Sequence, residues 1–149
     1  MMANIYPIWW DQTITIYNKF ENPQTQLITW YRTVINKCFW KNNIQKLTVG
    51  QETIETNSII CRIPKNDTFL EKYEWEKLPN DKMAEYFTLG KGDIIIKGSV
   101  EDVIDEYTKG SRSNDLKTKY AELGCMEIDN ISINTGTGVG MEHYLVRGI

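Results

Sequence analysis

Short stretches in which apolar and polar residues alternate dominate this chain, and they predict β-strands. Residues 13–19 place Ile14 and Ile16 on one face and threonines on the other. The longest such pattern covers residues 27–40, with Ile28, Trp30 and alternate residues up to Trp40 on one face. Aromatic side chains occur on both faces of this stretch. We therefore expect one face to pack on the core and part of the other to contact something else.

Further strands are predicted where short apolar runs are bounded by turn residues. Residues 58–63 end at Pro64, which lacks the N–H needed to continue a ladder. Residues 46–56 fit a ragged hairpin around Val49, Gly50 and Gln51. The remaining strands are expected at residues 93–98, 126–134 and 143–147.

Helical signals are few and short. Ser99 opens an S-x-x-D capping box, with Val100, Val103 and Ile104 as an apolar stripe, which predicts a helix starting at Ser99. A second short helix is expected over about residues 114–122. Residues 64–81 form a polar excursion that is either a long loop or a poorly formed helix.

The whole pattern predicts a mainly β fold, a small β-barrel or sandwich of about six to eight strands with one or two short α-helices. The chain of 149 residues fits a single β-rich domain over residues 1–149, with residues 1–12 as an extended N-terminal arm. Composition agrees, because Ala occurs only three times among nineteen Ile and fourteen Thr. Ala favours helices, whereas β-branched residues favour strands.

The net charge and the number of cysteines argue against several classes of protein. Seventeen basic and twenty acidic residues give a net charge of −3, which argues against a protein that fills a DNA groove. No apolar run approaches the roughly 20 residues of a membrane span, and no secretory signal is visible, so we expect no membrane association. Three cysteines without a C-x-x-C pair fit free thiols in a reducing cytoplasm.

Residues able to support catalysis are scarce, and we expect no enzyme, cofactor or metal site. His143 is the only histidine, so a nucleophilic dyad would have to join it to Cys38, Cys61 or Cys125. The glycine-rich stretch 136–140 lacks the G-x-G-x-x-G spacing of a dinucleotide site. The acidic residues at 101–106 are expected to form a solvated helix face.

Two adjacent tryptophans, Trp9 and Trp10, precede the first predicted strand. Neighbouring side chains of an extended segment point in opposite directions, so at most one easily enters the protein's own core. Trp is enriched at interface anchors. The pair therefore indicates a contact between subunits, although both rings could instead cover the edge of the core, or form a platform for stacking carbohydrate.

An ordered set of motifs gives the chain a family resemblance over residues 13–148. It resembles a group of small virion proteins from the head-to-tail joining region of tailed phages of Gram-positive bacteria, and is most similar to the head-closure (stopper) type. The motifs are TITIYNKF (13–20), WYRTVI (30–35) with Trp40, TLGKGDIIIKG (88–98), LKTKY (116–120), ISINTGTG (131–138) and HYLVRG (143–148).

The resemblance implies a structural protein of the virion, assembled in the host cytoplasm. Head-closure proteins are small β-barrels that form rings beneath the portal and adaptor and extend the DNA channel towards the tail. The implied partners are further copies of the chain, portal or adaptor and tail proteins, and genome DNA that passes without sequence-specific binding. The alternatives are a tail-terminator or tail-completion protein and, from a different class, a carbohydrate-binding β-sandwich.

Within such a ring, we expect Trp9 and Trp10 to be anchors between subunits. The polar stretch 65–82 or a glycine-rich loop is expected to be the channel or docking element. That loop comprises Asn134, Thr135, Gly136, Thr137, Gly138, Val139 and Gly140.

Overall fold

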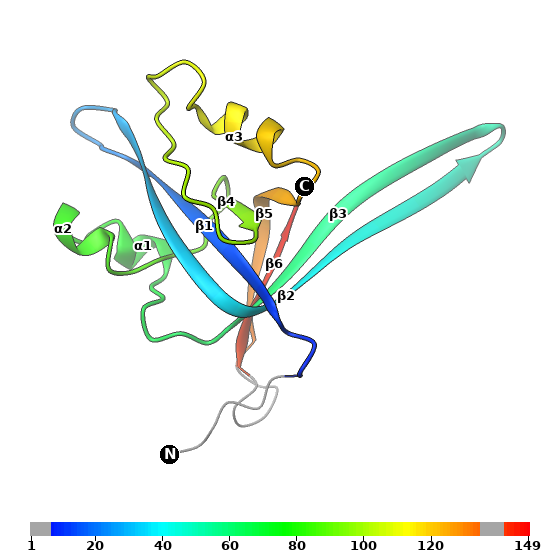
Figure 1. The fold of residues 1–149 in the computed structure, drawn as a ribbon, viewed down its shortest axis with the longest axis horizontal. Coiled ribbons are helices and arrows are strands. Elements are labelled where there is room, and N and C mark those ends of the chain that lie inside the picture. Colours follow the sequence, from blue (N-terminus) through cyan, green and yellow to red (C-terminus); the bar gives the residue numbers. More distant parts are fainter. Residues whose placement is uncertain (1–6, 135–141) are drawn as a thin grey trace.

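The computed structural model describes residues 7–134 and 142–149, and the side chains of these ranges other than 43–47 and 55–57. Within these ranges the chain forms a closed six-stranded antiparallel β-barrel with three short helices (Figure 1), which confirms the mainly β barrel prediction. The strands are β1 (Gln12–Glu21), β2 (Ile28–Val49), β3 (Glu52–Pro64), β4 (Ile94–Lys97), β5 (Cys125–Asn134) and β6 (His143–Gly148). The helices are α1 (Lys72–Trp75), α2 (Asn80–Met83) and α3 (Ser113–Lys119).

The strands follow the order β1-β2-β3-β6-β5-β4, and β4 returns to β1 to close the barrel. Each neighbouring pair is antiparallel. Closure gives every strand a partner on both sides, although β4 pairs with only residues 125–127 of the longer β5.

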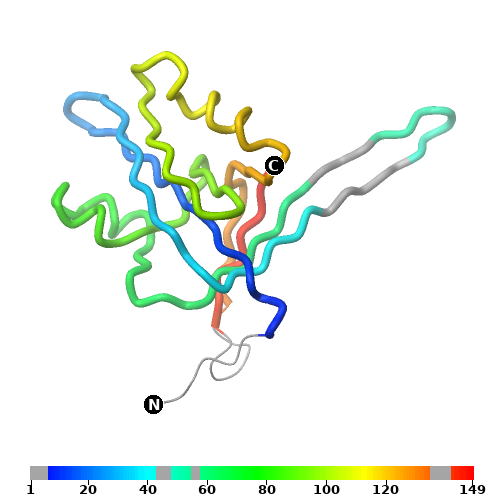
Figure 2. Tube along the Cα trace, viewed as in Figure 1, coloured from blue at the N-terminus to red at the C-terminus, as the bar shows by residue number. Residues whose placement is uncertain are grey.

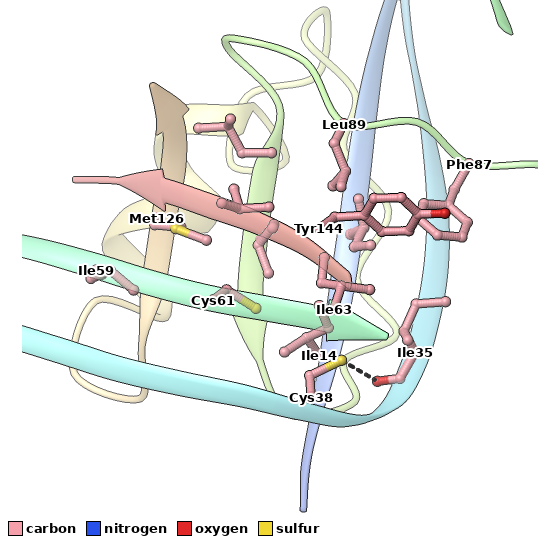
Figure 3. Close-up of a cluster of buried hydrophobic side chains, with 14 residues drawn as sticks. Ile14, Ile35, Cys38, Ile59, Cys61, Ile63, Phe87, Leu89, Met126 and Tyr144 are labelled. Carbon is pink, nitrogen blue, oxygen red and sulfur yellow. Dashed lines mark hydrogen bonds between the residues drawn. The ribbon is translucent and has the colours of Figure 1, made fainter. Parts of the chain in front are cut away.

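Two hydrophobic clusters use opposite faces of the same strands. Ile14 of β1 belongs to the cluster drawn in Figure 3, together with Ile16 of β1 and Ile95 of β4. Tyr17, Ile94 and Ile96 lie in a second cluster. The second cluster is completed by Val100 and Ile104 from the segment after β4 and by Leu116 of α3. The run of three isoleucines in β4 is therefore continuous because both faces of this strand are buried.

Strand β2 contains a bulge that reverses its alternation. Gln12 lies opposite Cys38 but Ile14 lies opposite Ile35, so β2 has an extra residue here, and Lys37 has a φ of 61°. Ile35 and Cys38, three positions apart, are both buried in the barrel interior (Figure 3). The expectation that all even-numbered residues of residues 28–40 share one face is wrong for this reason.

Beyond the barrel, β2 and β3 continue as a two-stranded ribbon that we call the arm, residues 43–58. Seven cross-strand pairs, from Asn43 with Ser58 to Val49 with Glu52, lie past the last pair that β3 makes with β6. At 3.3 Å per residue the arm reaches roughly 23 Å. The trace in Figure 2 and the ribbon in Figure 1 show it projecting away from the other elements. The hairpin predicted around Gly50 is confirmed as the tip of this arm.

The helix predicted at Ser99 does not form, and residues 99–112 run as loop and turns over the barrel. The Val100 carbonyl, which would be an acceptor in the first turn of that helix, accepts instead from Arg32 Nε, and the Val100 N–H donates to the Thr15 hydroxyl. The Tyr17 hydroxyl donates to the carbonyl of Asp102. The apolar stripe is still used, because Val100 and Ile104 are buried, whereas Val103 is exposed.

The polar excursion after β3 contains α1 and α2, each four residues long. It is held to the barrel by Trp75, which is fully buried and packs edge-on against Phe20 and Tyr31. Its indole N–H donates to the carbonyl of Met83 at the end of α2. Residues 64–81 thus combine loop with α1 and the start of α2, so each of the two predicted alternatives, a long loop and a poorly formed helix, is partly right. Helix α3 confirms the second predicted helix.

Candidate assembly surfaces

The cysteines are placed as core residues. Cys38 and Cys61 are fully buried in the barrel, and burial raises the pKa of Cys38 to about 12 and that of Cys61 well above its ordinary value. The half-buried Cys125 has a pKa raised to about 11, again chiefly by burial. Protonated thiols are poor nucleophiles and poor metal ligands. The described residues also contain no group of three His, Cys, Asp or Glu side chains arranged to hold a metal ion.

His143 joins three strands and the N-terminal segment. Its Nε2 lies 2.8 Å from Arg62 Nη1 on β3 and 3.0 Å from Asn134 Nδ2 on β5, so this nitrogen accepts from both. The ring also packs edge-on against Trp10, with 5.4 Å between centroids. These contacts give the histidine a structural role at this end of the barrel.

The two N-terminal tryptophans have different environments. Trp10 is 7% exposed and lies against Phe39 and His143, whereas Trp9 is 64% exposed. A turn in which the Trp10 N–H donates to the Pro7 carbonyl positions this segment. Trp10 is thus used inside the protomer, and Trp9, together with the exposed Ile8, remains available as a contact between subunits.

The arm presents exposed apolar residues at its tip. Val49 is 61% exposed and Ile54 is 51% exposed, on either side of the turn at Gly50. These two side chains are too few to form a large apolar patch, so the feature that distinguishes the arm is its projecting backbone. The sequence predicts the hairpin turn, but nothing in its pattern shows that the ribbon extends past the barrel.

A buried polar network fixes the 65–92 excursion to the barrel. The fully buried Asp93 carboxylate accepts hydrogen bonds from the Asn18 side chain, the backbone N–H groups of Lys19 and Gly90, and the ammonium of Lys72 on α1. Burial raises the pKa of Asp93, while Lys72 and the other donors oppose that rise. The sequence pattern does not reveal this cluster, because Asn18, Lys72 and Asp93 are far apart in the chain. The one sequence feature that could have indicated the network is an acidic residue, Asp93, directly before the three buried isoleucines of β4.

An open hollow of about 530 Å³ lies beside this network and shares Lys72 with it. Its lining combines Lys19, Lys72 and Lys91 with Glu21 and Glu76. Because both signs of charge line the same walls, the hollow selects neither an anion nor a cation.

The acidic residues at 101–106 are organised by α3 and not by a helix of their own. Asp102 pairs with Lys119 at 2.7 Å and accepts a 2.5 Å hydrogen bond from the Tyr120 hydroxyl. These two donors lower the pKa of Asp102. The group is solvated, in line with the surface role predicted from the sequence.

The predicted channel or docking loop lies almost entirely outside the described residues. Asn134 is its one described member, half-buried at the end of β5 and bonded to His143. Thr135, Gly136, Thr137, Gly138, Val139 and Gly140 fall in the range that the structure does not describe. The stretch 65–82 is described, and its described contacts tie it to its own barrel through Trp75 and Lys72. In the same described ranges, no helix has the length and apolar character needed to cross a bilayer.

Comparison with known proteins places the chain in a family. No curated protein and no solved structure matches it. One family model, described as a family of unknown function (DUF6751), matches residues 9–149, which include Trp9, the barrel and the arm. The chain therefore belongs to the DUF6751 family.

Proposed function

We propose that the protein is a non-enzymatic structural component of a tailed-phage virion, a protomer of a head-closure-type ring in the neck. The observation that carries this proposal is the arm, seven residue pairs long and partnered only by itself within the described chain. An isolated two-stranded hairpin is marginally stable in water. Such an arm favours a protein whose structure is completed by assembly, and the motif resemblance directs that assembly to the neck.

The barrel supports the head-closure type over a tail terminator, because the resemblance implies small β-barrels for head-closure proteins. The three helices have four, four and seven residues, and the strands form a single closed barrel. A mainly β protomer is the architecture expected for a stopper ring that extends the DNA channel.

The charge of the protein suits a channel wall. With a net charge of −3 the surface lacks the positive excess that grips phosphates, so DNA can pass without tight or sequence-specific binding. The proposed partners are further copies of the chain, the portal or adaptor above and tail proteins below, assembled in the host cytoplasm.

The carbohydrate-binding alternative has weaker support. A stacking platform needs accessible aromatic faces, but only Trp9 among the tryptophans is exposed. Trp10 and Trp75 are buried, and Trp30 and Trp40 are half-buried in the protomer.

The test is to locate the protein in virions. An antibody raised against the purified chain is applied to virions of the phage whose genome encodes it, and the label is found by electron microscopy. We expect label at the head–tail junction and, after chemical cross-linking, a ladder of multiples of the protomer mass. Absence from virions, or label on the capsid shell or the tail fibres, overturns the proposal.

Two variants link the test to the surfaces described above. Trp9→Ala should reduce incorporation into virions, since the exposed ring is its proposed subunit contact. Lys109→Ala, at another exposed position, is the matched control and should incorporate normally. Equal incorporation of the two variants would remove Trp9 from the interface.

A further inference from the structure

The arm is a ribbon with two free backbone edges. The register of β2 with β1 ends at the pair Gln12 and Cys38, so from Phe39 onwards the outer edge of β2 has no partner strand in the described chain. The register of β3 with β6 ends at the pair Ile59 and Gly148, which leaves residues 52–58 of β3 free on their outer edge. Free edges carry rows of unpaired N–H and C=O groups that can template another strand.

The two strands of the arm carry opposite charge, and position 46 of β2 lies opposite position 55 of β3 within the same arm. Residues 39–49 of β2 contain Lys41 and Lys46 and no acidic residue, whereas residues 52–58 of β3 contain Glu52 and Glu55 and no basic residue. Two β2 edges, or two β3 edges, would bring like charges together across a strand pair, which is destabilising. A β2 edge beside a β3 edge is the combination that charge favours.

Strand direction favours the same combination. β2 runs out to the tip and β3 runs back, so when arms point the same way around a ring, β3 of one copy lies antiparallel to β2 of the next. Antiparallel pairs are slightly more stable per residue than parallel ones. The contact is heterologous, and heterologous contacts generate closed rings when the rotation closes.

We infer that the free edges of the arm pair with the arms of neighbouring copies. β3 of one protomer adds to β2 of the next, so that the arms close into a second, intersubunit β-barrel. This inference rests on the proposed ring and specifies how its subunits join. It also buries the exposed Val49 and Ile54 at the tip, which the protomer alone leaves in water.

The test uses cysteine pairs divided between copies. Thr48→Cys on β2 is carried by the phage genome, and Thr53→Cys on β3 is supplied from a plasmid, with Glu52→Cys and Ile54→Cys as alternatives that scan the register. Virions containing both kinds of copy are purified and oxidised, and disulfide-linked dimers are separated by mass. Wild-type virions control for Cys38, Cys61 and Cys125.

We expect linked dimers in mixed virions at one or more scanned positions and none when either variant is present alone. Dimers formed by Thr48→Cys alone would show like-edge pairing and overturn the inference. Mixed virions with both variants incorporated but no linked dimer at any position would overturn it while leaving the ring in place. Absence of the protein from virions would overturn the proposed function as well.

A charge exchange provides an independent check. The fourfold variant Lys41→Glu, Lys46→Glu, Glu52→Lys and Glu55→Lys keeps opposite charges at positions 46 and 55 of its own arm, so it should incorporate normally when it is the only copy present. Mixed with wild-type copies it should incorporate at least tenfold less, because each contact between the two kinds of copy brings like charges together. Lys91→Glu with Lys109→Glu, outside the arm, is the matched control and should mix freely with wild-type copies. Free mixing of the fourfold variant with wild-type copies, with its barrel folded by circular dichroism, would contradict edge pairing by charge.

Discussion

The ion pair between Lys72 and Asp93 makes a quantitative prediction about stability. Asp93 is fully buried, and Lys72 Nζ lies 3.2 Å from its Oδ1 and 2.9 Å from the carbonyl of Lys19. Lys72→Met keeps the aliphatic stem and removes the charge. Breaking a fully buried ion pair costs about 3–5 kcal/mol, but Lys72 is 31% exposed and Asp93 keeps three other donors. We therefore expect a loss of about 2 kcal/mol at neutral pH, or about 4–8 °C in melting temperature.

This loss should depend on pH in a defined direction. The pKa of Asp93 is raised in the folded state, so the stability linked to its protonated form is fully present below the unfolded value of about 3.9. That stability is lost as pH rises through the folded-state pKa. Lys72 lowers the folded-state pKa, so its removal raises it further and extends this loss over a wider pH range. The difference between wild type and Lys72→Met should be smaller near pH 4 than near pH 7.

Urea denaturation at the two pH values measures both quantities. Lys82→Met is the matched control, because Lys82 pairs at 3.4 Å with Glu85 and both side chains are more than half exposed. An exposed pair of this kind contributes about 0–1 kcal/mol. If Lys72→Met loses no more stability than Lys82→Met, or loses the same amount at both pH values, the buried network does not hold α1 as described.

Three further predictions concern the barrel and its bend. Trp10→Ala should cost about 3–5 kcal/mol of unfolding free energy, because it empties a buried site, whereas Trp9→Ala should change it by less than about 0.5 kcal/mol; equal thermal shifts for the two would contradict their different burial. Lys37→Val should destabilise the protein by about 1–2 kcal/mol in urea, because a β-branched residue fits a φ of 61° poorly, and Lys37→Asn should be better tolerated; the reverse order would refute the bulge geometry. Gly148→Ala would place a Cβ 2.2 Å from the backbone oxygen of Glu127, so it should separate β6 from β5 and lower the melting temperature by about 8 °C or more; an unchanged melting curve would rule out this close approach.

Local pattern predicts most of the strands of this protein. The alternation at Ile14 and Ile16, the stop at Pro64 and the turn at Gly50 each depend on neighbouring residues, and each is confirmed. The failures occur where distant residues compete. Ser99 carries a helix-capping signal, but Arg32 from β2 takes the Val100 carbonyl that the first helical turn would use as an acceptor.

The candidate surfaces are predictable to a smaller extent. Because Trp9 and Trp10 are neighbours in the chain, the sequence predicts that their side chains point in different directions. It does not predict which one is buried, because the partners of Trp10, Phe39 and His143, come from β2 and β6. The network at Asp93 includes Asn18, which is 75 positions away in the chain, so no local sequence spacing predicts it. The length of the arm was not predictable either, since it depends on where β1 and β6 stop, not on β2 and β3 themselves.

The closure of the barrel has a consequence for how the chain folds. Its seams join strands that are roughly eighty residues apart, such as Ile14 of β1 with Lys97 of β4 and Ile63 of β3 with Tyr144 of β6. Loop-closure entropy must be overcome before such contacts form, which makes barrel closure slow. The arm hairpin, by contrast, joins neighbouring segments and can form within microseconds. Newly made chains would therefore present free ribbon edges before the barrel is complete, and pairing between chains could begin at the arm before each protomer has closed.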